Sequence, residues 1–547
     1  MNDAILSAPP AGNEPVRSYA PGTPERAALK AELGSLLSES FDIPLIIGGR
    51  ELRTGRTAPL AQPHDHGRPL GRFHLAGEEE AALAVDAALA AKPGWEAMPW
   101  EERAAVFRRA AALVAGKYRY RLLAATMLGQ SKTVHQAEID AVCETADFLR
   151  INPRFMEELY SIQPRSSDSE WNRVRYRPLE GFVYAVSPFN FTSIAANLAS
   201  APAMMGNVVV WKPASTSVLS NWILARIYEE AGLPPGVINF LPGSGAAVSA
   251  VALSHPSFAG LHFTGSTAVF NGLWRQAAAN LGSYRSYPRL VGETGGKDFV
   301  FLDPSADPDA AVAALVRGAY EYQGQKCSAA SRLYVPASLG RAFLDRLAEA
   351  VRSIPVGPPT DFRAFMGAVI DEASYRNILP YLERACSRGA ARCELELLAG
   401  GHGRAEEGWF IEPSLLLAES PDYETMREEL FGPVLTAYVY DDRDMEAAYR
   451  LVDGTSPYAL TGAVFARDRR AILAGLEALK NAAGNLYVND KPTGAIVGSQ
   501  PFGGMRASGT NDKAGSILNL IRWTSAGAVK ENFDPPVDWR YPFMAEE

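Results

Sequence analysis

The residues best suited to chemistry are one cysteine and one glutamate, each set among glycines and polar neighbours. The cysteine is Cys327, in Glu321-Tyr322-Gln323-Gly324-Gln325-Lys326-Cys327-Ser328, and the glutamate is Glu293, which opens Glu293-Thr294-Gly295-Gly296-Lys297. A thiolate attacks a carbonyl readily, and a nearby carboxylate can activate the water that later releases the thioester. The pair predicts aldehyde oxidation through a covalent intermediate.

A single cysteine more often fills a small apolar space in a core. Cys143 lies in a helical register, and Cys386 and Cys393 flank a segment with no acid or base partner, so we expect packing or surface roles for all three. We therefore expect only Cys327 to be catalytic.

Glu293 could be an ordinary solvated or ion-paired acid. It follows the strand-like run Arg289-Leu290-Val291-Gly292, however, and precedes Gly295-Gly296, where the backbone can turn sharply close to a ligand. The end of a strand is where α/β enzymes place reactive groups, which favours a role in chemistry.

Two α/β units are expected to position these residues, because 547 residues with 47% hydrophobic composition exceed what one core usually serves. Strand-length apolar runs alternate with helical runs, which predicts parallel sheets covered on both faces. The predicted strands of the first unit are Phe182–Val186, Val208–Trp211, Val237–Leu241 and Ala259–Phe263, with helices Val218–Gly232 and Ala246–Leu253 between them.

A second alternating set begins near Leu290 and runs to about Val488. It contains predicted strands Phe299–Leu302 and Arg332–Val335 and the predicted helix Asp307–Tyr320. Before the first sheet, the pattern predicts a short helix over Glu25–Leu37 and a helical layer over Glu78–Leu149.

Charge and cysteine content exclude several classes of function. The net charge is -9 without a concentrated basic tract, which argues against nucleic acid or an anionic membrane as the main partner. Four cysteines without Cys-x-x-Cys predict neither a disulfide framework nor a zinc site, and His64 and His66 are expected to form a polar turn and bind no metal.

The sequence contains no run of eighteen apolar residues, so we expect no membrane span. The first ten residues, Met1 to Pro10, show neither a basic leader with an apolar core nor an Arg-rich amphipathic helix. We expect a cytoplasmic bacterial protein, or a mitochondrial matrix protein if the source is eukaryotic.

Several segments resemble, in the same order, those of the aldehyde dehydrogenase superfamily, and the likeness covers nearly the whole chain. Besides the cysteine and glutamate motifs these are Ser187-Pro188-Phe189-Asn190-Phe191, Trp211-Lys212-Pro213-Ala214-Ser215, Phe263-Thr264-Gly265-Ser266-Thr267 and Glu428-Glu429-Leu430-Phe431-Gly432-Pro433. The resemblance implies a Rossmann-type NAD-binding domain, an α/β catalytic domain and a β oligomerisation element.

Within the superfamily the chain is most similar to the 1-pyrroline-5-carboxylate dehydrogenase branch, which oxidises L-glutamate γ-semialdehyde. The segments that carry this narrower resemblance are Ile43–Gly49, Gly129–Thr133 with Gln136–Asp140, Gly324–Ala329, and Gln500–Gly504 with Arg506–Lys513. The resemblance implies NAD-dependent oxidation to L-glutamate, the second step of proline catabolism. Oxidation of another semialdehyde, such as succinate semialdehyde, is the alternative, and a catalytically silent binding protein of the same fold is a third reading.

For catalysis, the resemblance assigns the nucleophile to Cys327, the base to Glu293, and the oxyanion to the Asn190 amide with the Cys327 N–H. Asn190 alone could simply cap a turn after Pro188.

For the cofactor, Lys212 emerges at a strand end where it can donate to ribose hydroxyls, and Gly265 and Ser266 open a helix suited to a pyrophosphate. A surface lysine and a plain helix cap are the alternatives. By resemblance Glu429 and Phe431 hold the nicotinamide ribose. Ser215 stands where many relatives carry a glutamate that repels a 2′-phosphate, which leaves NADP open beside NAD.

For the substrate, the resemblance packs the aliphatic chain between Phe191 and Phe502 and binds the carboxylate near Ser328, Gly494 and Ala495. Ala495 departs from relatives that carry serine there, which puts one hydrogen bond in doubt.

The predicted domains are a NAD-binding domain over 1–150 and 179–289, a catalytic domain over 290–488, and an oligomerisation hairpin with a C-terminal anchor loop and tail over 151–178 and 489–547. The resemblance pairs the hairpin with a C-terminal strand near Ile517–Trp523. It implies a homodimer or higher homo-oligomer, with a proline dehydrogenase as a further candidate partner.

Overall fold

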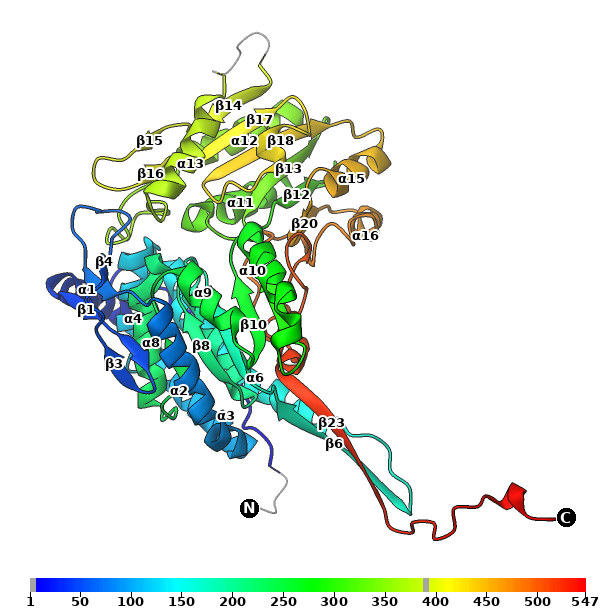
Figure 1. Ribbon diagram of the computed structural model, residues 1–547. Helices are drawn as coiled ribbons and strands as arrows, with labels where there is room; N and C mark the ends of the chain where they lie inside the picture. The colour runs from blue at the N-terminus through cyan, green and yellow to red at the C-terminus, as the bar shows by residue number, and fades with distance from the viewer. Residues whose placement is uncertain (1–5, 387–392) are drawn as a thin grey trace.

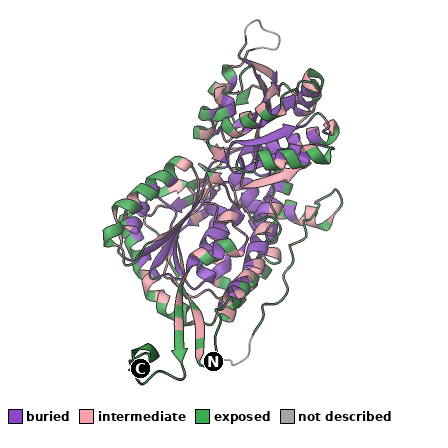
Figure 2. Cartoon of the chain, turned by 90° about the vertical axis from the view of Figure 1, so that its right-hand side faces the viewer, coloured by how far each residue is buried: buried purple, intermediate pink, exposed green. Residues whose placement is uncertain are grey.

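The computed structural model describes residues 6–386 and 393–547, so the extreme start of the chain, on which the absence of a leader was predicted, lies partly outside the described residues. Two seven-stranded sheets dominate the molecule, and a long two-stranded arm projects from it (Figure 1). Buried residues concentrate along the two sheets, whereas nearly all residues of the arm are exposed or of intermediate burial (Figure 2).

The first sheet has the strand order β11-β10-β7-β8-β9-β2-β3. Its five strands from β11 to β9 are parallel, and β2 and β3 are antiparallel additions at one edge. The bounds are β2 Leu45–Ile47, β3 Arg50–Leu52, β7 Phe182–Val186, β8 Val208–Lys212, β9 Ile238–Phe240, β10 Phe258–Thr264 and β11 Arg289–Glu293. Continuous apolar runs in β7, β8 and β10 are buried along nearly their whole length, as expected of parallel strands covered on both faces.

The strand order of the first sheet reverses beside β7. From β7 the chain builds β8 and β9 on one side, and β10 and β11 on the other. The crevice outside the carboxyl ends of the strands at such a reversal is where open α/β sheets bind ligands.

Helices from both the N-terminal layer and the sheet connections cover the first sheet. They are α1 Pro24–Ser38, α2 Glu78–Ala97, α3 Trp100–Ala115, α4 Arg119–Gln130, α5 Val134–Ala137, the π-helix η1 Glu138–Glu144, α6 Thr145–Ser161, α7 Thr192–Met204, η2 Ser215–Ser217, α8 Val218–Glu230, α9 Gly245–Ser254, α10 Thr267–Ala279 and η3 Leu281–Ser283. No helix in the described ranges is both long and apolar enough to cross a membrane.

The second sheet has the order β14-β17-β18-β13-β12-β20-β21, and only β14 is antiparallel to its neighbour. The strands are β12 Asp298–Leu302, β13 Ala330–Pro336, β14 Leu395–Ala399, β17 Ser414–Ala418, β18 Val434–Tyr440, β20 Thr461–Phe465 and β21 Asn485–Val488. Its helices are α11 Pro308–Tyr320, η4 Glu321–Gly324, α12 Gly340–Arg352, α13 Glu372–Glu383, α14 Glu424–Arg427, α15 Met445–Gly454 and α16 Arg469–Ala478.

Smaller elements surround the sheets. They are the sheet of β1 Phe41–Ile43, β4 Thr57–Pro59 and β5 Gly71–His74; the pairs β15 Gly403–Arg404 with β16 Phe410–Ile411 and β19 Tyr458–Ala459 with β22 Met505–Arg506; the arm of β6 Glu170–Pro178 with β23 Thr524–Asn532; and the helices α17 Ile517–Leu520, η5 Ile521–Trp523 and η6 Pro542–Met544.

One short crossing joins the two sheets and determines where the chemistry lies. Glu293 ends β11 at the carboxyl edge of the first sheet, and Asp298 begins β12 at the amino edge of the second. Because β12 pairs in parallel with β13, in the register Asp298 to Ala330, the loop before β13 lies at that same amino edge. Cys327, three residues before Ala330, thereby lies at the amino edge of the second sheet, where the crossing from Glu293 ends.

The individual strands and helices named above lie where expected, to within two residues at each end. The helical layer, however, continues to Ser161 through α6, into the segment predicted for the hairpin, whose strand β6 begins at Glu170. The strand expected near Ile517–Trp523 is wrong: this segment forms α17 and η5, and the strand follows at Thr524–Asn532. Ser516 caps α17 through the Leu518 N–H at 3.2 Å, and Trp523 is buried against His262. Core packing of Leu520 and Trp523 therefore takes this segment out of the arm. The division into domains stays a prediction.

Candidate active site

The nucleophile candidate lies in a loop with an unusual backbone. In η4, Tyr322 and Gln323 have φ of 54° and 56°, and Gly324 follows at 66°. A left-handed conformation costs a non-glycine residue about 1 to 2 kcal/mol, so other contacts must hold this turn.

Two glutamine side chains supply those contacts. The Gln323 amide donates to the carbonyls of Ser131 at 3.1 Å and Ala368 at 2.7 Å, and its oxygen accepts from the Gly367 N–H at 2.9 Å. Gln325 accepts from the Ile370 N–H at 2.8 Å. The turn is thus bonded on both sides to buried backbone, which fixes the loop that carries Cys327.

Cys327 keeps part of its surface exposed, although protein atoms closely surround its sulfur. Burial, followed by the negative charges of Glu293, Asp298 and Glu429, raises the pKa of the thiol well above its ordinary value. The stable form in this environment is therefore the thiol, and attack on a carbonyl requires a base to accept its proton.

Glu293 is the carboxylate with the strongest charge effect on that thiol. Burial raises the pKa of Glu293 to about 8, with Lys513 opposing the shift and Asp512 and Glu144 adding to it. A carboxyl that titrates close to neutral pH is suited to general base catalysis.

The glycines after Glu293 let the crossing pass against the cysteine loop. A Cβ on Gly296 would lie 2.0 Å from the Cys327 carbonyl oxygen, and one on Gly295 would lie 2.2 Å from Glu429 Oε2. Any side chain at these two positions would push the two segments apart.

Asn190 lies at the carboxyl end of β7 and is buried. Its side-chain amide donates to the Gln325 carbonyl at 3.1 Å, two residues before Cys327. An asparagine amide has a second N–H to donate, and the Cys327 backbone N–H itself interacts favourably with the Cys327 sulfur. The structure thus bonds Asn190 to the loop that carries Cys327, and it places Glu293 close enough for its charge to raise the pKa of the Cys327 thiol.

Four of the six predicted cofactor residues, Lys212, Ser215, Gly265 and Ser266, follow or end strands at the carboxyl edge of the first sheet. Lys212 ends β8, and its Nζ lies 3.9 Å from the position of a Cβ on Gly245 at the start of α9. Burial lowers the pKa of Lys212 to about 8. Within the described ranges its ammonium has no acidic partner, so it is available to hydroxyls of a ligand.

Gly265 follows β10, and Ser266 caps α10 through the Val269 N–H at 3.4 Å. The first turn of α10 therefore faces the crevice at the strand reversal, with the positive end of its dipole. Ser215 is exposed at the start of η2, beyond the end of β8.

Glu429 and Phe431 precede β18 at the amino edge of the second sheet. Glu429 Oε1 accepts from the Gly296 N–H at 2.8 Å, and burial raises the pKa of Glu429 to about 7. Phe431 has φ of 56° and packs edge-on to Phe189, with ring centroids 5.7 Å apart. These residues face the first sheet across the crossing.

Of the predicted substrate residues, Ser328 is buried and its Oγ lies 2.8 Å from Thr493 Oγ1, next to Gly494 and Ala495. Gly494 has φ of 90°, a conformation that favours glycine. Phe502 is half-buried and pairs through its backbone with Ala514.

The ring of Phe191 lies next to Lys132, a buried lysine that was not predicted as a site residue. Lys132 Nζ lies 4.1 Å from the Phe191 ring centroid and 4.5 Å from that of Tyr322, and pairs with Asp140 at 2.6 Å. Asp140 in turn accepts from the N–H groups of Thr192 and Ser193, the first residues of α7. The pair therefore holds the segment that carries Phe191. Lys132 and Asp140 stand in segments already singled out by resemblance, but nothing in their spacing indicated an ion pair.

Glu144 was also missed. Burial raises its pKa to about 8, and its carboxylate accepts from Ser193 Oγ at 2.9 Å. Its charge acts on that of Glu293, so both carboxyls face the same region. Its helical register gave no signal of this.

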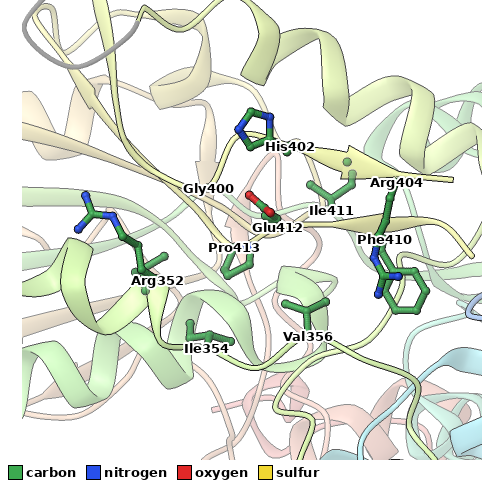
Figure 3. A pocket seen from close by; sticks show the side chains of 12 residues that line it. Arg352, Ile354, Val356, Gly400, His402, Arg404, Phe410, Ile411, Glu412 and Pro413 are labelled. Atoms are coloured by element: carbon green, nitrogen blue, oxygen red, sulfur yellow. The ribbon is translucent and has the colours of Figure 1, made fainter.

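A separate pocket lies elsewhere in the molecule. It measures about 490 Å³ and lies against β15 and β16. Figure 3 shows Arg352 and Arg404 on opposite sides of it, with His402 and Glu412 between them. Its lining, within the described ranges, includes none of the predicted site residues. Among the residues described, no group of three His, Cys, Asp or Glu side chains could hold a metal ion.

Two α/β sheets that meet at a junction with a thiol and a candidate base indicate the class of protein. A model of the aldehyde dehydrogenase family matches residues 52–526, and the chain belongs to this family. Among particular proteins, it is 52% identical over 537 residues to the mitochondrial Delta-1-pyrroline-5-carboxylate dehydrogenase of Dictyostelium discoideum, covering 98% of this chain and 96% of that protein.

Solved structures agree. Delta-pyrroline-5-carboxylate dehydrogenase from Mycobacterium tuberculosis bound with NAD is 51% identical, with a TM-score of 0.95 over 100% of both chains. 1-Pyrroline-5-carboxylate dehydrogenase from Thermus with bound NAD is 33% identical, with a TM-score of 0.89 over 96% of this chain and 100% of that one. The resemblance and the fold class predicted from sequence are confirmed.

Proposed function

We propose that this protein oxidises L-glutamate γ-semialdehyde, which is in equilibrium with 1-pyrroline-5-carboxylate, to L-glutamate with NAD as hydride acceptor. The observation that carries the proposal is the meeting of Cys327, Glu293 and Asn190 at one junction of two sheets, in a chain about half identical to dehydrogenases of that name.

In the proposed reaction, Cys327 Sγ bonds to the aldehyde carbon while its proton passes to a base, for which Glu293 is the nearest candidate. The oxygen that becomes negative accepts hydrogen bonds from the Asn190 amide and the Cys327 N–H, each such donor contributing about 3 to 4 kcal/mol to the barrier reduction. Glu293 then releases the thiol proton to solvent. After oxidation it accepts a proton from the water that attacks the thioester and passes that proton to the departing sulfur, which releases the carboxylate product with its second proton lost to solvent and restores the thiol.

NAD, when bound, accepts the hydride from the carbon attached to Cys327. The residues along the crevice fit such a group: Lys212 lacks an acidic partner within the described ranges, and Ser266 opens a helix whose dipole favours a pyrophosphate. Glu429 and Phe431 lie on the opposite edge, where they can contact the nicotinamide half. Ser215 carries no charge that would exclude a 2′-phosphate, and the NAD-bound relatives favour NAD.

The residues of the candidate site match the chemical groups of the proposed substrate. Phe191 and Phe502 offer apolar surface to the aliphatic chain, and Ser328 with the backbone of Gly494 and Ala495 can bind the α-carboxylate. Glu144 is a buried carboxylate in the same region, so we assign it to the α-ammonium of the substrate.

The test is a comparison of kcat/KM for L-glutamate γ-semialdehyde and for succinate semialdehyde, followed by NADH absorbance. Because succinate semialdehyde lacks the ammonium and is one carbon shorter, its kcat/KM should be lower by at least about tenfold, the effect of losing one good polar contact. A preference for succinate semialdehyde would refute the substrate assignment. NADPH formation in a parallel series gives the cofactor preference.

We also propose a homo-oligomer. An isolated two-stranded ribbon is marginally stable in water, yet β6 and β23 pair over nine residues as a projecting arm (Figure 1). Trp171 on the arm and Phe533, Trp539, Tyr541 and Phe543 beyond it are strongly exposed, which favours a second copy as their cover. We further propose a cytoplasmic location if the source is a bacterium. The eukaryotic relative from Dictyostelium is mitochondrial by name.

A further inference from the structure

A buried glutamate between two lysines links the nucleophile loop to the loop expected to bind the substrate carboxylate. Glu321 Oε2 lies 3.2 Å from Lys326 Nζ and 3.2 Å from Lys491 Nζ. Glu321 and Lys326 are buried, and the Lys491 side chain retains 21% of its exposure. None of the three has a role in the chemistry described above.

The two lysines come from different segments of the site. Lys326 directly precedes Cys327, whereas Lys491 is followed by Pro492, Thr493 and Gly494. A second contact, between the hydroxyls of Ser328 and Thr493 at 2.8 Å, runs parallel to the ion pairs. The loop that carries Gly494 is thus attached to the nucleophile loop at two points.

Glu321 is well placed to act as the fixed point. It follows the last residue of α11 and starts the left-handed turn that leads to Cys327. The Lys491 loop lies on the last turn of the same helix, since a Cβ on Gly318 would lie 3.4 Å from Lys491 Cβ and from Pro492 Cδ.

The charges favour this arrangement. Burial alone would raise the pKa of Glu321, but Lys326 and Lys491 hold it below its ordinary value, so the carboxylate is ionised. Burial lowers the pKa of Lys326 to about 8, and Lys491 places a second ammonium against the same carboxylate. A positive charge there favours a carboxylate ligand at Gly494.

We propose that Glu321 is a positioning residue that sets the distance between Cys327 and the carboxylate-binding loop, and thereby selects aldehydes with a carboxylate at matching distance. This inference rests on the proposed function.

The test uses the full-length protein and five variants: Glu321→Gln, Lys491→Met, the two combined, Lys491→Arg and the control Lys92→Met. KM and kcat for L-glutamate γ-semialdehyde and the inhibition constant of L-glutamate report on the carboxylate loop. The rate at which iodoacetamide, a neutral reagent, alkylates Cys327 reports on the nucleophile independently.

Lys491→Met should raise KM and the L-glutamate inhibition constant about tenfold, because small displacements of a positioned group have large effects. The kcat and the alkylation rate should stay within about twofold, and Lys491→Arg should restore most of the loss. The double variant should be no worse than Glu321→Gln, since both substitutions break one link.

Additive effects in the double variant would show that Lys491 binds substrate directly and would overturn the proposal. An unchanged KM, or an equal loss in the alkylation rate of Lys491→Met, would also overturn it. Lys92→Met is the matched control, because Lys92 is similarly enclosed, at 14% exposure, and paired with Glu96 far from the site. Inactive wild-type protein would refute the proposed function itself, whereas active wild type with unaffected variants refutes only this inference.

Discussion

Glu293 and Cys327 are held in a setting that disfavours charge on both groups. Burial raises the pKa of both, and the carboxyl charge raises that of the thiol further. In this setting a charge on either group is favourable only when a proton moves between the groups or to water. The proton transfers of the base and of the nucleophile therefore follow one another. The sequence indicated both residues, but their pKa shifts depend on burial that only the fold provides.

Substitution of Glu293 by glutamine should remove the pH dependence of turnover near neutrality. With a pKa of about 8, the carboxylate that accepts a proton becomes more abundant as pH rises through that value. Wild-type kcat should therefore rise between about pH 7 and 9, whereas Glu293→Gln should be flat and about 10² to 10⁴-fold slower.

The measurement is a pH series of kcat for both proteins, with Glu80→Gln as control, a largely buried carboxylate at the start of α2. The control should keep the wild-type profile. A rise through pH 8 that persists in Glu293→Gln would assign the titration to another group.

Among the elements, regular ones could be predicted and the functional irregular ones could not. The strands β7, β8 and β10 can be recognised in the sequence as apolar runs between helical segments. The left-handed turn of η4 has no such pattern, because Tyr322 and Gln323 adopt their positive φ only under tertiary contacts with Ser131, Gly367 and Ala368. The π-helix η1, which carries Asp140 and Glu144, likewise cannot be predicted from the 3.6-residue period of an α-helix.

Gly324→Ala tests that turn. Gly324 has φ of 66°, and a Cβ there would lie 2.2 Å from the Gly432 carbonyl oxygen. We expect the free energy of unfolding to fall by more than about 1 kcal/mol. Because the displaced loop carries Cys327, kcat/KM should fall about 10²-fold.

Thermal or urea unfolding and NADH formation measure the two effects. Gly34→Ala is the control: Gly34 lies in α1 with nothing within 4 Å of an added Cβ, so stability should be equal or higher. Wild-type activity in Gly324→Ala would mean that the turn does not position the nucleophile.

At the scale of the whole molecule, the site exists because two sheets meet edge to edge. The carboxyl edge of the first supplies Asn190, Lys212 and Glu293, and the amino edge of the second supplies Cys327 and Glu429. Alternation of strands and helices predicted both sheets. It could not predict that the four residues between Glu293 and Asp298 bring the two edges together, nor that Trp523 would be packed into the core and move the arm strand to Thr524–Asn532.

The most direct measurement of the central claim is NADH formation from L-glutamate γ-semialdehyde by the wild-type protein and by Cys327→Ala, with NAD affinity determined in parallel. The account predicts no detectable turnover in the variant and NAD affinity within about twofold of wild type, because the thiol forms the covalent bond but does not build the crevice. Cys386→Ala, which removes a thiol far along the second sheet, should remain fully active. Turnover that survives the loss of Cys327 would contradict the account.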